Sequence, residues 1–365
     1  MSFRIRKIET RIVHHRIRPE LVVISWAGKH DTSRFVEVTV HGDGGHRGYG
    51  EAATVALWSG ESAETAQIMI RRVFAPLLLG ARFDHPREAL LLMDKAAYAN
   101  PFTKAALDMA LWDLWAKSRG VSVMKLIADR KPVTTIPTRA SVGAYPVART
   151  LKIAKHFWKE GIRTIKFKTG LPGMDDAARL RAVRDALGDE PVFTVDYNGA
   201  FRNAGDAVRH IEKLLPYRLA LVEQPTHRER IKLLADVRRR VRVPILADEC
   251  IFSPEQLAEA LDCDAFDILS IYAGKNGGFT HALDMVKTAH RAGKRCTIGS
   301  NLESDIGQAA MACLAASLSA FPVEKIACDF PSSLFYTKSS VTSPLQLRQG
   351  RIEVPTKHGF GVKPR

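Results

Sequence analysis

The stretch Thr164-Ile165-Lys166-Phe167-Lys168 decides both the fold and the chemistry predicted for this chain. It reads as a β-strand, because Ile165 and Phe167 fall on one face and Lys166 and Lys168 on the other. Two neighbouring ammonium groups repel each other, and burial beside a second cation can bring the pKa of a lysine to roughly 7–8, the range of a general base. The same pattern also fits a solvated edge strand with two exposed lysines. The residues downstream favour the first interpretation.

A regular alternation of strands and helices surrounds this stretch. Each predicted strand is followed by a helical pattern, and the strand ends recur at near-even spacing. This alternation predicts an α/β fold, a TIM-type parallel (β/α)8 barrel, which we place over residues 132–339. The predicted strands are Ile136–Val142, Thr164–Lys168, Val192–Asp196, Leu219–Glu223, Ile245–Asp248, Ile268–Tyr272, Cys296–Ser300 and Ile326–Phe330.

The residues before the barrel have a different texture. The opening residues read as strands, and three helical patterns follow, the last of them over Asn100–Gly120. We predict that Asn100 caps this helix. The pattern indicates an N-terminal α+β domain over residues 1–131. We expect a hairpin-like segment at residues 345–354 to return to its sheet, so that residues 340–365 complete the domain.

The net charge of +15 is unusually basic and first suggests nucleic-acid binding. However, the basic residues are dispersed through predicted helices, as in Arg238-Arg239-Arg240, without interleaved aromatic residues. A solvated basic surface is therefore favoured, with attraction of an anionic small molecule as the alternative. We expect no nucleic-acid partner.

The cysteine pattern and the hydropathy indicate the compartment. The five cysteines are scattered and never form a C-x-x-C pair, which is typical of neither a disulfide framework nor a zinc site. No run approaches the ~20 apolar residues that are needed to cross a bilayer, and the first residues lack the apolar block of a signal peptide. We therefore expect a cytoplasmic protein with no membrane partner.

Polar side chains follow the predicted strands at their carboxyl ends, where barrel enzymes build their active sites. The third strand ends at Asp196 with Asn198 close behind, the fourth ends at Glu223, and the fifth ends at Asp248 followed by Glu249. Each acid alone could simply cap the next helix. Three carboxylates at one mouth repel one another unless a cation joins them, and ligation by oxygen alone favours Mg²⁺. Beside a lysine pair, these acids indicate a metal site.

Five short motifs together resemble the signature of the enolase superfamily. Within it they are similar to the mandelate racemase/muconate lactonizing enzyme family, on the muconate-lactonizing side. Gly48-Tyr49-Gly50-Glu51 and the helix over Asn100–Gly120 also fit that family's N-terminal capping domain, so the resemblance spans nearly the whole chain. The five motifs are Lys166-Phe167-Lys168, Val195-Asp196-Tyr197-Asn198, Val222-Glu223-Gln224-Pro225, Ala247-Asp248-Glu249 and Lys275-Asn276-Gly277-Gly278.

The resemblance implies an Mg²⁺-dependent acid/base enzyme. Asp196, Glu223 and Asp248 would be the magnesium ligands. Lys168 would remove the proton α to a substrate carboxylate, with Lys166 as the cation beside it. The resulting enediolate carries two negative charges, which a metal and nearby cations stabilise better than the ground state. The other site residues that the family implies, near the substrate or behind the ligands, are Asn198, Glu249, Lys275, Asn301 and Glu303.

The chain departs from the family at the end of the sixth strand. Muconate-lactonizing members usually carry a second lysine there, on the opposite face of the substrate, whereas counting back from Asn276-Gly277-Gly278 gives Tyr272. The histidine that the mandelate-racemase branch uses at the seventh strand is absent too, because that strand reads Cys296–Ser300. A neutral tyrosine leaves Lys168 as a single base. A tyrosine whose pKa is lowered by neighbouring cations would supply a second acid/base.

The favoured function is therefore a lyase or isomerase, either muconate cycloisomerase-like or an acid dehydratase. The alternatives are a racemase or epimerase that uses Tyr272, and a non-catalytic metal-binding barrel. In the family, two capping-domain loops set the substrate, here Arg16–Asp31 and Val55–Glu61. The first is rich in basic residues such as Lys29 and His30, which hints at an acidic or polyol-acid substrate, although ordinary solvated charge fits as well. We expect a small-molecule carboxylate substrate and, by the resemblance, a homo-oligomer.

Overall fold

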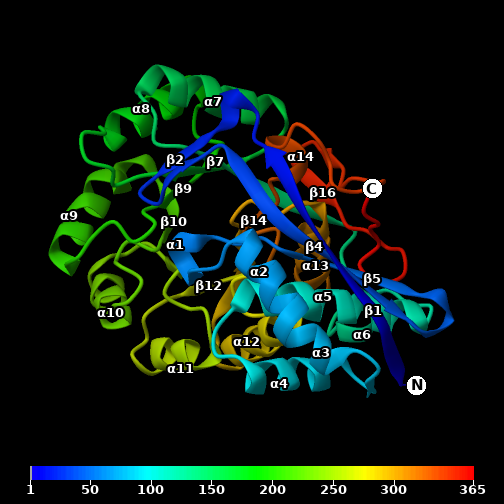
Figure 1. The fold of residues 1–365 in the computed structure, drawn as a ribbon. Helices are drawn as coiled ribbons and strands as arrows, with labels where there is room; N and C mark the ends of the chain where they lie inside the picture. The colour runs from blue at the N-terminus through cyan, green and yellow to red at the C-terminus, as the bar shows by residue number, and fades with distance from the viewer. Residues whose placement is uncertain (1) are drawn as a thin grey trace.

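Two sheets organise the chain, a parallel barrel and an antiparallel N-terminal sheet (Figure 1). The computed structural model describes residues 2–365, and Met1, the first residue of the predicted N-terminal domain, lies outside the described residues. In Figure 1 the barrel helices form a ring, and the long N-terminal strands cross one side of it.

The barrel confirms the fold class predicted from the alternation. Strands β7 to β13 are hydrogen-bonded in chain order, and β14 pairs with β7 on its other side. Between β13 and β14, the hydroxyl of Thr297 donates a hydrogen bond to Ala327 O at 3.2 Å. The barrel strands are β7 (Thr135–Val142), β8 (Thr164–Lys168), β9 (Val192–Asp196), β10 (Leu219–Glu223), β11 (Ile245–Ala247), β12 (Ile268–Ile271), β13 (Arg295–Ile298) and β14 (Cys328–Asp329).

The helices between these strands cover the outside of the barrel (Figure 1). Each turns an apolar stripe inward. Helix α9, for example, buries Ala204, Ala207, Val208 and Ile211, which follow the spacing of one helix face. The barrel helices are α7 (Val147–Lys159), α8 (Asp176–Leu187), α9 (Ala204–Leu214), α10 (Ile231–Arg240), α11 (Pro254–Asp262), α12 (Phe279–Arg291) and α13 (Asp305–Ser317), with the short α14 (Ser332–Phe335) after β14.

The barrel interior changes character along its axis. Leu221, Leu246, Ile268 and Ile326 form a separate buried apolar cluster inside it. The polar side chains lie at the carboxyl ends of the same strands, and the cavity that they line is described below. The apolar cluster closes the interior below them, so the chemistry is confined to one mouth.

The N-terminal sheet has the order β5-β4-β1-β6 and packs against one long helix, α5. The backbone approach is so close that a Cβ at Gly48 or Gly50 would lie 1.9 Å from Ala110 O or Ala106 O of this helix. The Gly-Tyr-Gly-Glu motif is therefore a packing requirement. The strands are β1 (Phe3–Arg16), β4 (Thr32–Gly42), β5 (Arg47–Ala52) and β6 (Arg82–Phe83), and a small hairpin is formed by β2 (Val23–Ser25) and β3 (Gly28–His30).

The helices of this region depart in one place from the predicted pattern. The helix predicted over Asn100–Gly120 is present, but the prediction that Asn100 caps it is wrong, because Asn100 has φ +58° and its amide donates to Tyr98 O. Glu61 replaces it by accepting hydrogen bonds from the backbone of Phe102 and Thr103 at 3.2 and 2.8 Å. The helices are α1 (Ala56–Ser59), α2 (Ala63–Met69), the π-helical turn η3 (Ile70–Phe74), α3 (Ala75–Leu78), α4 (Pro86–Ala96), α5 (Pro101–Ser118) and α6 (Val123–Ile127). Short 3₁₀ turns lie at η1 (Pro19–Leu21), η2 (Asp43–Gly45) and η4 (Leu215–Tyr217).

The C-terminal hairpin does not return to the N-terminal sheet, so that prediction is wrong. Strands β15 (Leu347–Arg348) and β16 (Arg351–Glu353) extend the barrel sheet, because β16 pairs antiparallel with β7. The free edge of β7 below its pairing with β14 is the partner that the sequence pattern did not reveal. Phe360 N, beyond the hairpin, donates to Asp113 of α5 at 2.8 Å. The domain boundaries at residues 131 and 340 stay a prediction.

Buried carboxylates join the N-terminal sheet and α5 to the ends of barrel helices. Glu51 accepts hydrogen bonds from the backbone and hydroxyl of Ser304, the N-cap of α13. Asp108 accepts from the backbone and hydroxyl of Thr280 near the start of α12, at 2.7 and 2.8 Å. A helix N-terminus offers unpaired N–H groups and a partial positive charge, which favours an acceptor there.

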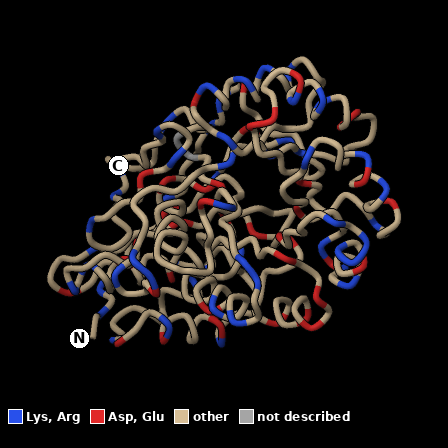
Figure 2. Tube along the Cα trace, turned by 180° about the vertical axis from the view of Figure 1, so that it is seen from behind, with Lys and Arg blue, Asp and Glu red and all other residues tan. Residues whose placement is uncertain are grey.

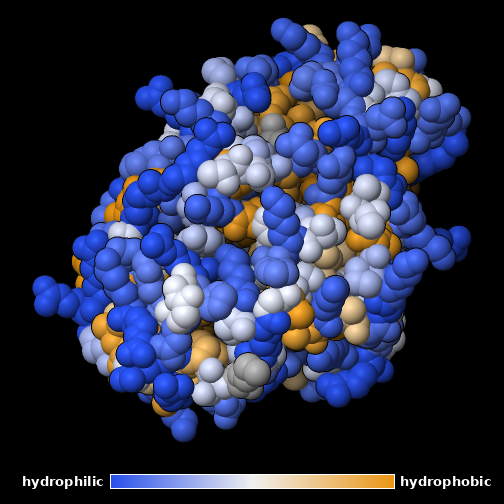
Figure 3. All heavy atoms as spheres, turned by 90° about the vertical axis from the view of Figure 1, so that its right-hand side faces the viewer, coloured by the Kyte–Doolittle hydropathy of each residue, from blue (hydrophilic) through white to orange (hydrophobic). Residues whose placement is uncertain are grey.

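The surface agrees with the solvated basic face expected from the composition. In Figure 2, Lys and Arg positions are spread around the molecule among Asp and Glu positions. The face in Figure 3 is mainly hydrophilic, with small separate groups of hydrophobic residues. Within residues 2–365, every helix is too short or too polar to span a bilayer.

The Glu51 contact predicts how stability depends on pH. Burial raises the pKa of Glu51 to about 8 from the ordinary value near 4.5. The folded state therefore binds this proton more tightly than the unfolded state, and its contribution to the free energy of unfolding falls as pH rises from 4.5 to 8. Glu51→Gln keeps an acceptor for Ser304 without the charge. We expect the variant to unfold at higher urea concentration than the wild type at pH 8.5, with a smaller difference at pH 5.5.

The matched control is Glu64→Gln, because Glu64 is exposed and its pKa is lowered. That carboxylate is ionised at both pH values, so the control should leave the pH dependence unchanged. A wild type whose stability falls between pH 5.5 and 8.5 as steeply as that of Glu51→Gln would contradict the prediction.

Candidate active site

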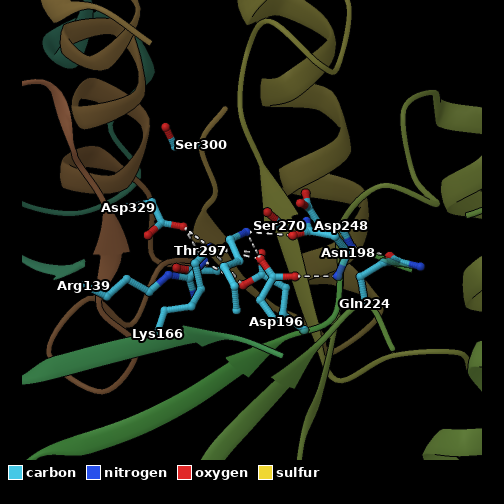
Figure 4. Close-up of polar contacts among 12 residues, drawn as sticks. Arg139, Lys166, Asp196, Asn198, Gln224, Asp248, Ser270, Thr297, Ser300 and Asp329 are labelled. Carbon is cyan, nitrogen blue, oxygen red and sulfur yellow. Dashed lines mark hydrogen bonds and ion pairs between the residues drawn. The ribbon is translucent and has the colours of Figure 1, made fainter. Parts of the chain in front are cut away.

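The carboxyl ends of β8 to β11 bring together the lysines and acids predicted from the sequence. Lys166 and Lys168 project from β8, Asp196 ends β9, Glu223 ends β10, and Asp248 directly follows β11. Because the strands are parallel, all five side chains reach one mouth, where they line a cavity of about 130 Å³. Figure 4 labels Lys166, Asp196 and Asp248 among them. The convergence predicted from the strand ends is present in the fold.

Each of the three predicted metal ligands is paired with a lysine. All three carboxylates are buried. Ammonium groups therefore compensate negative charge that would otherwise be costly in the interior. The pairs are Lys168 Nζ with Asp196 Oδ2 at 2.5 Å, Lys166 Nζ with Glu223 Oε1 at 3.2 Å and Lys275 Nζ with Asp248 Oδ1 at 2.8 Å.

The two lysines of β8 meet at the same carboxylate. Lys166 Nζ also lies 3.5 Å from Asp196 Oδ2, the oxygen that Lys168 contacts. Burial alone would raise the pKa of Asp196, but the charges of Lys168 and Lys166 outweigh it and hold that pKa below its usual range. Burial, together with the charge of Asp196, raises the pKa of Glu223 to about 7, against the opposing charge of Lys166.

Lys166 is held as a cation by a carboxylate that the sequence analysis missed. Asp329, at the end of β14, accepts a hydrogen bond from Lys166 Nζ at 2.8 Å and one from Arg139 Nη2 of β7 at 2.9 Å. Burial lowers the pKa of Lys166, but the charges of Asp329 and Glu223 outweigh burial and raise it above the ordinary value. Figure 4 shows Arg139 and Lys166 both directed toward Asp329.

The donor set fits a hard divalent cation, but the lysines occupy it. Within residues 2–365, no group of three or more His, Cys, Asp or Glu side chains is placed to hold a metal ion. The three lysine–carboxylate pairs explain this, because each ammonium contacts an oxygen that a metal would use. Glu249 Oε2, next in sequence to Asp248, is buried without a hydrogen-bond partner among the described residues. The site thus offers oxygen ligands alone, as Mg²⁺ requires.

Asn198 and Glu249 form a second layer behind Asp196. Asn198 N donates to Asp196 Oδ1 at 2.9 Å, and its side-chain oxygen accepts from Lys168 Nζ at 2.9 Å. Its side-chain amide donates to Glu249 Oε1 at 2.6 Å. Burial, reinforced by the charge of Asp248, raises the pKa of Glu249 to about 8. This layer fixes the orientation of Asp196 and Lys168.

Tyr272 lies behind the cavity wall, and its hydroxyl is a neutral donor. It is fully buried, and its Oη has no hydrogen-bond partner among the described residues. Burial raises its pKa well above the usual value, and the charges of Asp248 and Glu249 add to this. The lysine cations do not depress its pKa, so the condition under which Tyr272 acts as a base at neutral pH is not met. Lys275 Nζ lies 4.6 Å from its ring centroid.

Three other predicted site residues take different places. Lys275 is buried outside the cavity and also donates to Ser270 O at 2.9 Å. Glu303 accepts from the hydroxyl of Ser300 and from the backbone of Asn301 within its own turn. Asn301 lines the cavity and donates to Ala53 O at 2.6 Å. The carboxylate of Glu303 thus stabilises its own turn by hydrogen bonds.

Both predicted specificity loops reach the cavity. The β2–β3 hairpin contributes Ser25, Lys29 and His30, and the second loop contributes Leu57 and Trp58. The first loop is less cationic than its sequence suggests. Lys29 pairs with Asp31 at 2.7 Å, and burial lowers the pKa of His30.

Two further residues lie at the mouth, Asp329 and Arg139, and both have features in the sequence that point to this position. Asp329 lies at the end of the eighth predicted strand, where the rule that found the other acids also applies. Arg139 is the one charged residue of its strand, on the same face as Ser141 of the cavity wall. Its partner could be identified only in the folded chain.

Comparisons with known families match nearly the whole chain. Residues 7–128 match the mandelate racemase/muconate lactonizing enzyme N-terminal domain. Residues 149–365 match the enolase C-terminal domain-like family.

Similar proteins include enzymes of more than one reaction type. Muconate cycloisomerase 1 of Rhodococcus opacus is 30% identical over 89% of this chain and 87% of its own length. D-Ala-D/L-Ala epimerase of Cytophaga hutchinsonii is 31% identical over 90% and 87%. Among solved structures, the dipeptide epimerase of Enterococcus faecalis V583, complexed with Mg and the dipeptide L-Leu-L-Tyr, has a TM-score of 0.90 at 26% identity, covering 99% of both chains. The relatives share the fold and differ in the reaction.

The Asp329 contacts predict a large loss of stability when one partner of the buried network is removed. Asp329→Asn leaves Lys166 and Arg139 with one carboxylate fewer, and we expect a loss of about 3–5 kcal/mol in the free energy of unfolding, measured by urea denaturation in EDTA. Asp264→Asn removes an exposed partner of Arg238 and Lys294 and should cost about 0–1 kcal/mol.

A second variant keeps the comparison informative if Asp329→Asn fails to fold. The double variant Arg139→Met/Asp329→Asn removes one charge of each sign and should recover part of the loss. Equal effects of the Asp329 and Asp264 substitutions would show that the network does not hold Lys166.

Proposed function

The chain belongs to the mandelate racemase/muconate lactonizing enzyme family of the enolase superfamily, and on that premise we propose that it is an Mg²⁺-dependent enzyme in which Lys168 removes the proton α to a substrate carboxylate. The observation that carries this proposal is the meeting of Lys166 and Lys168 at Asp196 Oδ2, inside a cavity bounded by three strand-end carboxylates. A base, a fixed cation and a set of oxygen ligands therefore share one mouth.

The residues that would hold the metal are Asp196, Glu223 and Asp248. All three are acidic, buried and on consecutive strands. A bound divalent ion would supply positive charge to the substrate carboxylate and to the anion formed from it. Lys275, already on Asp248, and Asn198, already on Asp196, would keep those ligands oriented.

The two lysines of β8 divide the work. Lys166 stays charged because Asp329 and Glu223 hold it, so it provides fixed positive charge beside the reacting groups. Lys168, whose ammonium donates hydrogen bonds only to Asp196 and Asn198 among the described residues, is the base. Lys168 first gives up one ammonium proton to solvent, and as a neutral amine it then takes the α-proton at Nζ, while the C–H electron pair passes into the enediolate. The ammonium that results can return the proton.

The environment of Tyr272 favours chemistry on one face of the substrate. A neutral, buried phenol behind the cavity wall can donate a hydrogen bond but is a poor base. Lys168 then acts alone, which suits a cycloisomerisation or a dehydration. The second candidate is an epimerase, favoured by the similarity to D-Ala-D/L-Ala epimerase, in which Tyr272 would supply the acid on the other face.

We also propose a cytoplasmic homo-oligomer that binds neither nucleic acid nor membranes. The five cysteines are free thiols, and four of them are buried. Exposed apolar residues on the N-terminal domain, including Ile68, Leu77 and Leu91, provide surface that a second copy could cover. The mixed charge in Figure 2 supports the absence of a nucleic-acid face.

Exchange of the α-proton in D₂O tests the role of Lys168. With Mg²⁺ and a panel of carboxylic acids, we expect the wild type to exchange the α-proton of at least one acid. Lys168→Ala should lose exchange by more than about 10²-fold, because a positioned base contributes about 10²–10⁴-fold. Deuterium incorporation followed by NMR is the measurement.

Tyr272→Phe is the matched variant, because it removes only a hydroxyl. Under the one-base proposal it keeps Lys168-dependent exchange. Loss of exchange from one enantiomer with retention in the other would favour the epimerase instead. Exchange that persists in Lys168→Ala would remove Lys168 from the role of base.

A further inference from the structure

His30 lies at the cavity in a position that the surrounding backbone fixes. It ends β3, in the hairpin that reaches over the mouth, and it is one of the residues that line the cavity. The hairpin is anchored on the barrel, because Ala144 N donates to Ile24 O at 2.7 Å and the hydroxyl of Tyr145 donates to Val22 O. The position of His30 relative to Lys168 is therefore set by backbone contacts.

A chain of hydrogen bonds determines which nitrogen of His30 carries the proton. Tyr336 Oη contacts Leu302 O and lies 2.6 Å from Ser33 Oγ. A carbonyl oxygen only accepts, so the single phenolic proton goes to Leu302 O. The hydroxyl of Ser33 must then donate to Tyr336 Oη. Because the only proton of this hydroxyl is donated to Tyr336, Ser33 Oγ accepts a hydrogen bond from His30 Nε2, which is 2.7 Å away.

His30 therefore carries a proton on Nε2, and in the neutral ring, which a lowered pKa favours, Nδ1 keeps a lone pair. Burial lowers its pKa, and the charge of Lys168 acts in the same direction, while Asp31 opposes them. Tyr336 keeps its proton, because burial raises its pKa well above the usual value. Nδ1 has no hydrogen-bond partner among the described residues.

The charges in the cavity decide what this acceptor can bind. A second carboxylate on the substrate would be repelled, because its oxygen lone pairs would face the lone pair of Nδ1. An ammonium group would share the cavity with Arg139, Lys166 and Lys168, whose carboxylate partners are already paired. A neutral donor remains. Ser25, on the same hairpin, also lines the cavity, and its hydroxyl accepts from Ala27 N and can donate, so a group that both donates and accepts fits best.

We propose that His30 selects a carboxylate substrate that carries a hydroxyl group away from the reacting carbon, by accepting a hydrogen bond from that hydroxyl at Nδ1. This inference rests on the proposed function for the position of the substrate carboxylate, and it narrows the substrate class to hydroxy acids. The reacting end lies at Lys168, and the hydroxyl lies under the hairpin.

Matched acids test the selection by binding alone. Calorimetric titration of the Mg²⁺-loaded protein with 3-hydroxybutyrate, 4-hydroxybutyrate and butyrate compares ligands that differ only in the hydroxyl. In the wild type we expect one hydroxy acid to bind about 3- to 10-fold more tightly than butyrate, the value of one hydrogen bond. His30→Phe should bring that ratio within about 2-fold, and His30→Gln, which keeps an acceptor oxygen, should retain part of it.

The control is His46→Phe, at an exposed histidine beyond the other end of the N-terminal sheet, which should leave the ratio unchanged. Butyrate that binds as tightly as both hydroxy acids, or a ratio that survives in His30→Phe, overturns the proposal. So does a wild type that binds neither hydroxy acid.

The tautomer has a separate spectroscopic signature. In protein labelled with ¹⁵N-histidine at pH 7, the resonance lost in His30→Phe should show a protonated Nε2 and an unprotonated Nδ1. Ser33→Ala, which removes the acceptor of Nε2, should mix the two tautomers. A proton on Nδ1, or an imidazolium, in the wild type contradicts the proposal.

Failure of the proposed function is distinguishable from failure of this inference. Lys168→Ala should lose proton exchange and keep the preference for the hydroxy acid. If the tighter binding of a hydroxy acid depends on His30 but the protein exchanges no α-proton, the proposed reaction is wrong and the proposed role of His30 stands. If the protein exchanges the α-proton but binds hydroxy acids no more tightly than butyrate, the proposed role of His30 is wrong and the proposed reaction stands.

Discussion

The compensation of buried negative charge at the mouth of the barrel is the constraint on which the rest of the site depends. Asp196, Glu223, Asp248 and Asp329 are all buried within one opening. Carboxylates taken out of water are costly unless cations lie beside them. Lys166, Lys168, Lys275 and Arg139 supply those cations from β8, the loop after β12 and β7.

This balance has a consequence for the chemistry. The four acids and four basic side chains cancel when all are ionised, so a divalent cation adds net positive charge to the mouth. A substrate carboxylate and the enediolate made from it are the anions that such a site accommodates. Lys166 contacts three carboxylates, those of Asp196, Glu223 and Asp329, and stays charged. Lys168 contacts one carboxylate and the side-chain amide of Asn198. The difference between two lysines of one strand arises from their partners.

The N-terminal domain is fixed by buried carboxylates that accept hydrogen bonds from backbone N–H groups, and so it gives the cavity a defined roof. Glu51, Glu61 and Asp108 each place a buried carboxylate on the backbone at the start of a helix. These contacts join β5 to α13, the loop Val55–Glu61 to α5, and α5 to α12. The hairpin that carries His30 rests on the barrel through backbone and tyrosine contacts. The cavity is therefore lined by groups from both domains at fixed positions.

The regular alternation of strands and helices made the barrel and its strand-end acids predictable, because the end of each strand can be located from its own residues. Asp329 obeyed the same rule and was overlooked, whereas the role of Arg139 required knowing that β14 pairs with β7. The capping of α5 by Glu61 and the pairing of β16 with β7 are contacts between distant segments, which local patterns do not encode. The protonation of His30 depends on Ser33, Tyr336 and Leu302, so the sequence alone could not reveal it.

Titration of Mg²⁺ into metal-free wild type and Lys168→Met tests the central claim most directly. The claim is that lysine ammonium groups hold the carboxylates that a metal would bind. Removing the ammonium at Asp196 ends that competition, so the variant should bind Mg²⁺ more tightly than the wild type, as measured by calorimetry at pH 7. Weaker or unchanged binding in Lys168→Met, or a wild type that binds no Mg²⁺, would contradict the account.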